Sequence, residues 1–271
     1  MIIWTVANQK GGVGKTTTTT ALAGLAAEQG LRVLLLDLDP HGSLTSYFRQ
    51  DPDMLDKSAF TLFDARGHLD QALLNSVIVK TEFPGIDLIP AATILATLER
   101  KAIGQDGLGL VVSRTLELLE DQYDMAIIDT PPLLGVLMVN ALAACQQLII
   151  PVQTEFLAIK GLERMVNTMT MMSRSRRQVP RYVIVPVMFD RRTQASVSSL
   201  RTIRFEHPDY TWPGKIPIDT KFRDASKAGI PPHLFEPESH GVEAYRSLFK
   251  WLRQQDRLVS TDTRQLAGGQ M

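Results

Sequence analysis

The sequence predicts an α/β fold in which a mainly parallel, twisted sheet is flanked by helices on both faces. Several strand-length segments are apolar throughout, and segments with helical spacing separate them along the 271-residue chain. Strands of this kind are buried on both sides, which is typical of parallel sheets covered by crossover helices. One domain of this class is ordinary for such a length.

Strands and helices alternate in the prediction. The expected strands are Ile2–Ala7, Arg32–Asp37, Ile86–Pro90, Met125–Asp129, Leu148–Val152, Tyr182–Met188 and a short Lys215–Pro217. The expected helices are Thr16–Gln29, Gly109–Asp121, Ala158–Ser173, Thr193–Phe205 and Gly241–Arg257. We expect a single domain over residues 1–258 and a polar, disordered tail over residues 259–271.

A glycine- and lysine-rich loop joins the first strand to the first helix. It reads Lys-Gly-Gly-Val-Gly-Lys-Thr-Thr from Lys10 to Thr17. Glycines let backbone N–H groups face a phosphate, the helix N-terminus and Lys15 favour negative charge, and the Thr16 hydroxyl can ligate Mg²⁺. The predicted nucleotide-binding residues of the loop are Gly11, Gly12, Val13, Gly14, Lys15, Thr16 and Thr17. The usual G-x-x-x-x-G-K-[ST] pattern has glycine where this chain has Gln9, and Lys10 is an extra lysine.

Three carboxylates follow predicted strands near this loop. Asp37 and Asp39 end the second strand and Asp129 ends the fourth. Ligands of open parallel sheets bind at the carboxyl ends of strands, so we expect these groups to converge. Asp39 is the candidate to orient or deprotonate an attacking water. Thr16, Asp39 and Asp129 are the candidate Mg²⁺ residues, with Asp129 acting through water; a capping role with Thr130 is the alternative for Asp129.

Charge is balanced over the whole chain but not along it. The formal net charge is +0, so bulk charge predicts no polyanionic partner. Between residues 174 and 205, however, eight arginines accompany one acid, Asp190. They are Arg174, Arg176, Arg177, Arg181, Arg191, Arg192, Arg201 and Arg204. This local basic region is either a phosphate-binding surface or a solvated surface at helix ends.

Cysteine usage and hydropathy bound the cellular context. Cys145 is the only cysteine, so no internal disulfide and no cysteine-based metal site of the chain can form, which suits a reducing compartment. Its small apolar neighbours favour a buried thiol. The sequence shows neither a signal peptide nor a long apolar run, so we expect a cytoplasmic protein and no membrane partner.

The loop resembles the deviant Walker A motif of the ParA/MinD family of ATPases. Other segments that resemble this family follow in order from about Ile2 to Leu252. They are Asp37–Ser43, Ile127–Pro132, Asn140–Ala144, Ile149–Val152, Phe156–Leu162, Ile216–Pro217 and Ala225. The chain looks like a short, stand-alone ParA-type protein, and its N-terminal stretch is most similar to members that position chemotaxis arrays or other cargo.

This resemblance implies a P-loop NTPase fold and an ATPase that uses ATP and Mg²⁺. The catalytic residues would be Lys10, Lys15 and Asp39, and Lys10 would reach across an ATP-dependent homodimer to the phosphates of the facing subunit. Without the surrounding motifs, a solvated loop lysine would be the preferred interpretation of Lys10. Hydrolysis would be slow and stimulated by a partner or cargo-adaptor protein. His41 stands where the family commonly has glutamine, a change that we expect to be tolerated.

Two further sites rest on the resemblance. Met188, Pro217 and Asp219 would contact the adenine, although Met188 at a strand end also suits a core position. Arg192 and Lys221 would contact DNA phosphates without sequence preference. The stripe of apolar residues in the last helix suits packing on the sheet better than membrane targeting of the MinD kind.

Four functions compete at this stage. The main one is a switch that positions an intracellular cargo, such as a chemotaxis array or polar structure. The alternative is a plasmid or chromosome partition ATPase that binds DNA non-specifically, with a nucleoid-associated location. An ATP-dependent synthetase would not need Lys10, and a nucleotide-dead adaptor would not need Lys15, Thr16, Asp39 and Asp129.

Overall fold

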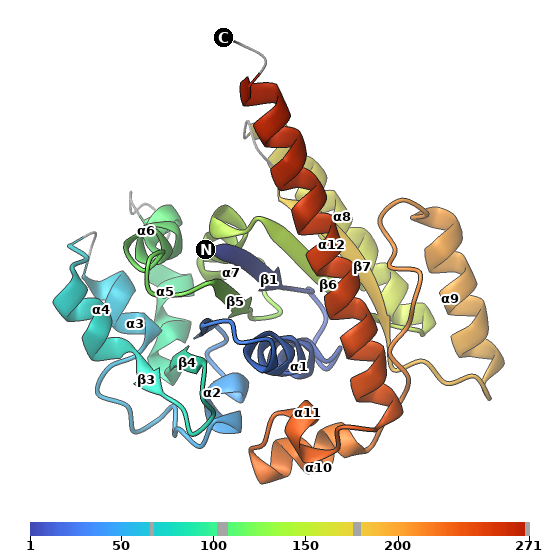
Figure 1. The fold of residues 1–271 in the computed structure, drawn as a ribbon, viewed down its shortest axis with the longest axis horizontal. Helices are drawn as coiled ribbons and strands as arrows, with labels where there is room; N and C mark the ends of the chain where they lie inside the picture. The colour runs from blue at the N-terminus through green and yellow to red at the C-terminus, as the bar shows by residue number, and fades with distance from the viewer. Residues whose placement is uncertain (66–67, 102–107, 176–179, 269–271) are drawn as a thin grey trace.

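The fold is built on one seven-stranded sheet with the strand order β3-β4-β2-β5-β1-β6-β7 (Figure 1). The structure, a computed structural model, describes residues 1–65, 68–101, 108–175 and 180–268. The strands are β1 (Ile2–Val6), β2 (Val33–Asp37), β3 (Val79–Lys80), β4 (Ile86–Ile89), β5 (Met125–Asp129), β6 (Gln147–Gln153) and β7 (Arg181–Val187). Every pairing is parallel except that of β3 with β4. The predicted fold class is confirmed.

Helices connect these strands and cover both faces of the sheet. They are α1 (Lys15–Glu28), α2 (Ser43–Tyr47), α3 (Ala59–Asp64), α4 (Gln71–Val77), α5 (Ala96–Lys101), α6 (Val111–Leu118), α7 (Val136–Ala144), α8 (Phe156–Ser175), α9 (Gln194–Glu206), α10 (Lys221–Ala228), α11 (Pro232–Phe235) and α12 (His240–Gly268). Two 3₁₀ turns, η1 (Thr93–Leu95) and η2 (Leu108–Leu110), precede α5 and α6.

The central strands are largely apolar because each face of the sheet meets its own layer of helices. In β2, Val33 and Leu35 pack into the cluster formed with α1 and α12, whereas Leu34 and Leu36 pack into the cluster on the side of α3 to α7. A third cluster lies between the β6–β7 end of the sheet and helices α7, α8 and α9. Successive side chains of a strand therefore point alternately into two buried cores, and neither face of the strand is exposed to solvent.

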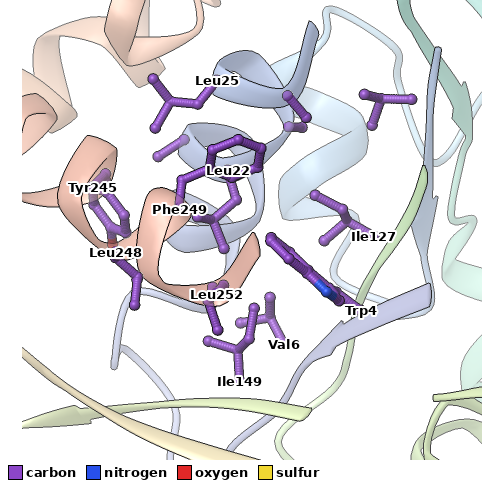
Figure 2. Packing of buried hydrophobic residues seen from close by; sticks show 14 of the residues in the cluster. Trp4, Val6, Leu22, Leu25, Ile127, Ile149, Tyr245, Leu248, Phe249 and Leu252 are labelled. Atoms are coloured by element: carbon purple, nitrogen blue, oxygen red, sulfur yellow. The ribbon is translucent and has the colours of Figure 1, made fainter. Parts of the chain in front are cut away.

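Helix α12 lies along one face of the sheet and buries the apolar stripe noted in the sequence (Figure 2). Tyr245, Phe249 and Leu252 are almost completely buried. The rings of Trp4 and Phe249 meet edge-on with centroids 5.7 Å apart. The stripe is therefore a packing surface. Among the described residues, no helix is both long enough and apolar enough to span a membrane.

Three local features differ from the expectation. Lys215–Pro217 forms no strand but an isolated bridge, Phe189↔Pro217, because the positive φ of Met188 interrupts the extended backbone that it would pair with. The helix expected over Gly109–Asp121 is shortened to a 3₁₀ turn followed by α6. Helix α12 continues to Gly268, beyond the boundary we placed at Arg257, and the sequence between those residues contains no glycine or proline to stop it.

Candidate functional site

Three adjacent strands deliver the candidate residues to one edge of the sheet. β5 lies between β1 and β2, and its last residue, Asp129, is in register with Val6 of β1 and Asp37 of β2. β1 leads directly into the glycine-rich loop and α1. The convergence expected from the sequence is therefore the geometry that the parallel register enforces.

The glycine-rich loop forms an open cradle at the start of α1. Gly12 and Gly14 have φ of 74° and 78°, a left-handed conformation that side chains rarely adopt. A Cβ atom placed on Gly11 or Gly12 would meet nothing within 4 Å, so space is open above the loop. No side chain caps the N-terminus of α1. Its free N–H groups and the buried Lys15, which is 8% exposed, suit an anionic phosphate.

A pair of buried carboxylates faces this cradle. Asp37 accepts hydrogen bonds from the backbone N–H of Thr45 at 2.8 Å, from the hydroxyl of Thr45 at 2.7 Å and from the N–H of Asp39 at 3.0 Å. Asp129 accepts from the hydroxyl of Thr16 at 2.6 Å and from the N–H of Thr130 at 3.1 Å. Asp129 thus makes the local contact with Thr130 and also reaches the phosphate-loop threonine.

Burial controls the protonation of these groups. It raises the pKa of Asp129, and the negative charge of Asp37 raises it further. Burial likewise raises the pKa of Asp37, against the hydrogen bonds from Thr45. The pKa of Lys15 is lowered by burial, while Asp129 and Asp39 oppose that shift. Keeping neighbouring buried carboxylates ionised costs free energy unless a cation lies beside them. The Thr16 hydroxyl and the carboxylates supply the oxygen ligands that Mg²⁺ prefers.

Asp39 lies at the rim of the site, more exposed than the buried pair. Its side chain is 14% exposed and accepts hydrogen bonds from the backbone N–H of His41 at 3.1 Å and from the His41 ring at 2.9 Å. The imidazole itself is 80% exposed. His41 therefore steadies the carboxylate from the solvent side and leaves the phosphate side of Asp39 accessible.

Lys10 is directed to its own subunit. Its ammonium donates to Oε1 of Gln153 at 2.9 Å and forms an ion pair with Glu155, both at the end of β6. Its backbone N–H donates to Oδ1 of Asn8 at 3.0 Å. The sequence reasoning missed Gln153 and Glu155. Their only signal was a run of three polar residues, Gln153 to Glu155, between the strand ending at Val152 and the helix entry at Phe156.

The predicted adenine residues line one pocket of 590 Å³. Its lining comes from the start of α1, the end of β7, the segment before α10, α10 itself and α12: Gly14, Thr17, Val187, Met188, Ile216, Pro217, Ile218, Asp219, Thr220, Phe222, Arg223, Ser226, Lys227 and Tyr245. Asp219 accepts from the N–H groups of Lys221 at 2.9 Å and Gly241 at 3.0 Å, so it also ties α10 to α12. The pocket adjoins the phosphate cradle at Gly14.

The two predicted DNA-contacting residues are exposed and each has an acidic neighbour. Arg192 is 81% exposed and holds the carboxylate of Asp190 through two hydrogen bonds of 2.9 Å, which lower the pKa of Asp190 to about 2. Lys221 lies 3.3 Å from Glu236. Arg176, Arg177 and the side chain of Arg174 lie outside the described residues.

Comparison with known proteins places this site in a family. Residues 1–179 match the family model described as an AAA domain. The sporulation initiation inhibitor protein Soj of Bacillus subtilis is 32% identical over 90% of this chain and 95% of its own length. The chromosome partitioning protein ParA of Caulobacter vibrioides is 33% identical over 93% of this chain and 94% of its own.

A solved structure agrees with these sequences. The crystal structure described as cobyrinic acid a,c-diamide synthase from Mycobacterium smegmatis, with bound ATP analog and magnesium, has a TM-score of 0.80 and 31% identity. The match covers 95% of this chain and 96% of that one. Together with the extra loop lysine, these likenesses are decisive: the chain belongs to the ParA/MinD-type ATPases with a deviant Walker A loop.

Proposed function

We propose that this chain is a partition ATPase that dimerises on binding ATP and Mg²⁺, binds DNA without sequence preference, and hydrolyses ATP slowly until a partner stimulates it. The observation that carries the proposal is the single edge of the sheet that joins the phosphate cradle, Lys15, Thr16, the three aspartates and the extra Lys10. Together these groups supply the positive charge, the metal-binding oxygens and the water-orienting carboxylate that the transfer of a phosphoryl group to water requires.

The relatives favour partition over the positioning of a chemotaxis array. Soj and the Caulobacter vibrioides protein are named for sporulation control and chromosome partitioning, and another relative, 30% identical, is the cell division protein PomZ of Myxococcus xanthus. The similarity of the N-terminal stretch to array-positioning members is therefore the weaker guide. Partition of a chromosome or plasmid becomes the preferred function, and cargo positioning the second.

The residues divide the chemistry as follows. The loop N–H groups and Lys15 would hold the phosphates. Thr16, together with Asp129 acting through water, would hold Mg²⁺, which would supply positive charge beside the phosphoryl group. Asp39 orients the attacking water from the rim. Lys10 of the facing subunit adds positive charge only when two subunits meet, so that hydrolysis depends on dimerisation.

The synthase name of the Mycobacterium smegmatis structure suggests another activity, which Cys145 counts against. Transfer of an amide nitrogen from glutamine through a thiolate needs an accessible cysteine of lowered pKa. Cys145 is buried, and burial raises its pKa to about 12. ATP turnover that rose with cobyrinic acid and glutamine would favour the synthase.

Asp39→Ala tests the cycle. The variant should bind ATP but leave the water unoriented, so sedimentation in Mg²⁺-ATP should show a persistent dimer with hydrolysis near background. Wild type should dimerise transiently and bind any DNA sequence while ATP lasts. Normal ATP turnover by Asp39→Ala would show that Asp39 takes no part in hydrolysis. If ATP-loaded wild type did not bind DNA at low salt, the DNA-binding part of the proposal would be wrong.

Mixing variants tests whether Lys10 acts in trans. Lys10→Ala should bind ATP as a monomer and hydrolyse little. When it is mixed with Asp39→Ala, one site of the mixed dimer combines an intact Asp39 with an intact Lys10 from the other subunit. Turnover should therefore partly recover. A silent mixture in which mixed dimers are shown to form would place the action of Lys10 within its own subunit.

A further inference from the structure

Contacts within its own subunit fix both the side chain and the backbone of Lys10. Its ammonium is shared between the amide oxygen of Gln153 and the carboxylate of Glu155, and its backbone N–H is fixed by Asn8. Asn8 is itself anchored, because its amide donates to the carbonyl oxygen of Pro151 at 2.8 Å. Lys10 is 28% exposed at its side chain, far less than a loop lysine in free solution. The lysine that a facing subunit would need is therefore bound by residues of its own subunit.

Gln153 connects this held lysine to both parts of the nucleotide site. Its Oε1 accepts from Lys10, while its Nε2 donates to the carbonyl oxygen of Gly12 at 3.0 Å and to the sulfur of Met188 at 2.9 Å. Gly12 belongs to the phosphate cradle and Met188 lines the 590 Å³ pocket. One amide therefore links the lysine, the loop and the pocket wall.

Met188 has the features of a residue that a ligand can displace. It has a positive φ of 52°, and the only other non-glycine residue of the described chain with a positive φ is Arg49. Such strain persists where surrounding contacts enforce it, and it gathers at functional sites. Met188 is 38% exposed although it directly follows β7, and its terminal methyl lies 3.6 Å from a Cβ placed on Gly14. A base bound at the end of the pocket that adjoins Gly14 would therefore contact Met188.

We propose that Gln153 and Glu155 form a latch that holds Lys10 within its own subunit, and that a nucleotide base in the pocket loosens the latch by taking Met188 from Gln153. Once nucleotide has loosened the latch, Lys10 can contact the facing subunit when the dimer forms. This regulation rests on the proposed function, because it concerns a lysine that acts in trans. Gln153 and Glu155 are positioning residues.

The expected effect is modest in one subunit and larger in the dimer. The Lys10–Glu155 pair is partly exposed, so its removal should free Lys10 about three-fold. Both subunits must release a lysine before they can face each other, and the factors multiply. Loss of the latch should therefore lower the dimer dissociation constant about ten-fold.

Glu155→Gln is the direct test, since it keeps the shape of the side chain and removes its charge. In Mg²⁺ and a non-hydrolysable ATP analogue, the base loosens the Gln153 contact, whereas the Glu155 pair still holds Lys10 in wild type. Sedimentation over a range of protein concentrations should therefore show the variant dimer forming at about ten-fold lower concentration than the wild-type dimer. Glu163→Gln is the matched control: Glu163 forms a comparable exposed pair with Lys160 on α8, the helix that follows Glu155, and its removal should change nothing.

The double variant separates the latch from the proposed function. Lys10→Ala with Glu155→Gln should behave as Lys10→Ala alone, because a latch has no effect without its lysine. Weaker or unchanged dimerisation of Glu155→Gln would overturn the latch. If Lys10→Ala alone dimerised as wild type, the action of Lys10 in trans, and not the latch, would be the part that fails.

Chemical labelling tests the link to the base. Acetylation of Lys10, measured by mass spectrometry at a dilution where the protein is monomeric, should proceed faster in Glu155→Gln and faster in wild type with ADP than without. Inorganic tripolyphosphate, which has no base, should give no such increase. Met188→Leu keeps the apolar volume but removes the sulfur acceptor, so ADP should change its labelling little. An ADP effect equal in Met188→Leu and wild type would overturn the link.

Discussion

The phosphate end of the sheet and the exposed segment before α9 that contains Arg192 both carry charged groups, but they hold them in different ways. Asp37 and Asp129 are 0% and 1% exposed, and each has at least two hydrogen-bond donors. Arg192 is 81% exposed and is held by one neighbouring acid. Buried charges depend on a fixed set of partners, whereas exposed charges add small and separable terms. Mutations should therefore have large, specific effects in the first region and small, additive ones in the second.

Lys15→Ala should have the largest effect. Removing a buried ammonium that faces phosphates should weaken ATP binding by roughly 100-fold and abolish ATP-dependent dimerisation. Equilibrium binding of labelled ATP measures the first and sedimentation the second. Lys57→Ala removes an exposed lysine and serves as the control. Affinity near that of wild type in Lys15→Ala would contradict the assignment of the cradle.

Asp129→Asn should separate activity from stability. Because burial raises the pKa of Asp129 in the folded chain, the stability of the nucleotide-free protein falls as pH rises through that pKa. The asparagine side chain does not ionise, so the variant avoids this decline. At pH 8.5 its melting temperature should exceed that of wild type by about 2 °C for each kcal/mol of difference in the free energy of unfolding. At pH 5.5 the two melting temperatures should be similar. Turnover of Mg²⁺-ATP should fall sharply.

Asp124→Asn should change the melting temperature in the opposite direction. Arg32 lowers the pKa of Asp124 to about 2, so its carboxylate stabilises the fold above the ordinary pKa of an aspartate, and the amide should melt below wild type at both pH values. Equal shifts in the two variants would show that burial does not govern the Asp129 site.

Arg192→Glu, alone and with Lys221→Glu, should reduce DNA binding equally on every sequence. Removing one phosphate-binding cation should lower the dependence of log affinity on log salt by about 0.9. Binding isotherms on two unrelated duplexes over a range of salt measure both effects. Lys80→Glu changes a similarly exposed lysine on β3, at the far edge of the sheet, and should have little effect. An unchanged salt slope in the double variant would leave these residues as solvated surface.

The smallest effect concerns His233, whose Nδ1 is buried without a hydrogen-bond partner where α11 meets α1. Burial lowers its pKa, with Glu28 opposing and Arg246 adding to the shift. The unfolded chain therefore binds a proton first, and stability should decline as pH falls below about 6.5. His233→Gln should show a shallower decline between pH 7.5 and 5.5 in thermal melts, and an identical slope would argue against this titration.

The sequence could predict the features that contiguous residues determine. The cradle follows from the order of glycines before Lys15, and the meeting of Asp37 and Asp129 follows from two apolar strands that end in acids. The pairing of Lys10 with Glu155 could not be predicted, because it depends on how β6 lies beside β1 and on side-chain rotamers. The protonation of the acid pair likewise depends on burial that only the packed structure supplies.

The pocket wall shows the same limit. Helices α10 and α11 are only eight and four residues long, and the sequence analysis predicted neither of them. Their place is set by distant contacts, such as the hydroxyl of Tyr47 donating to the carbonyl oxygen of Ile230 at 2.8 Å. The expected strand at Lys215–Pro217 was wrong because the positive φ of Met188 breaks the extended backbone between Pro186 and Phe189, the two residues with which the segment forms hydrogen bonds.

The outer margins of the sheet bear on how copies of this chain can join. Along β7, the segment from Tyr210 to Ile218 returns and occupies backbone groups of Ile184, Pro186 and Phe189. At the opposite margin, β3 has only two residues and carries the exposed Lys80. Neither margin offers a long row of vacant amides, so fibre growth by strand addition is disfavoured. Contacts between copies of this chain would then rest on side-chain surfaces instead of on the pairing of strands.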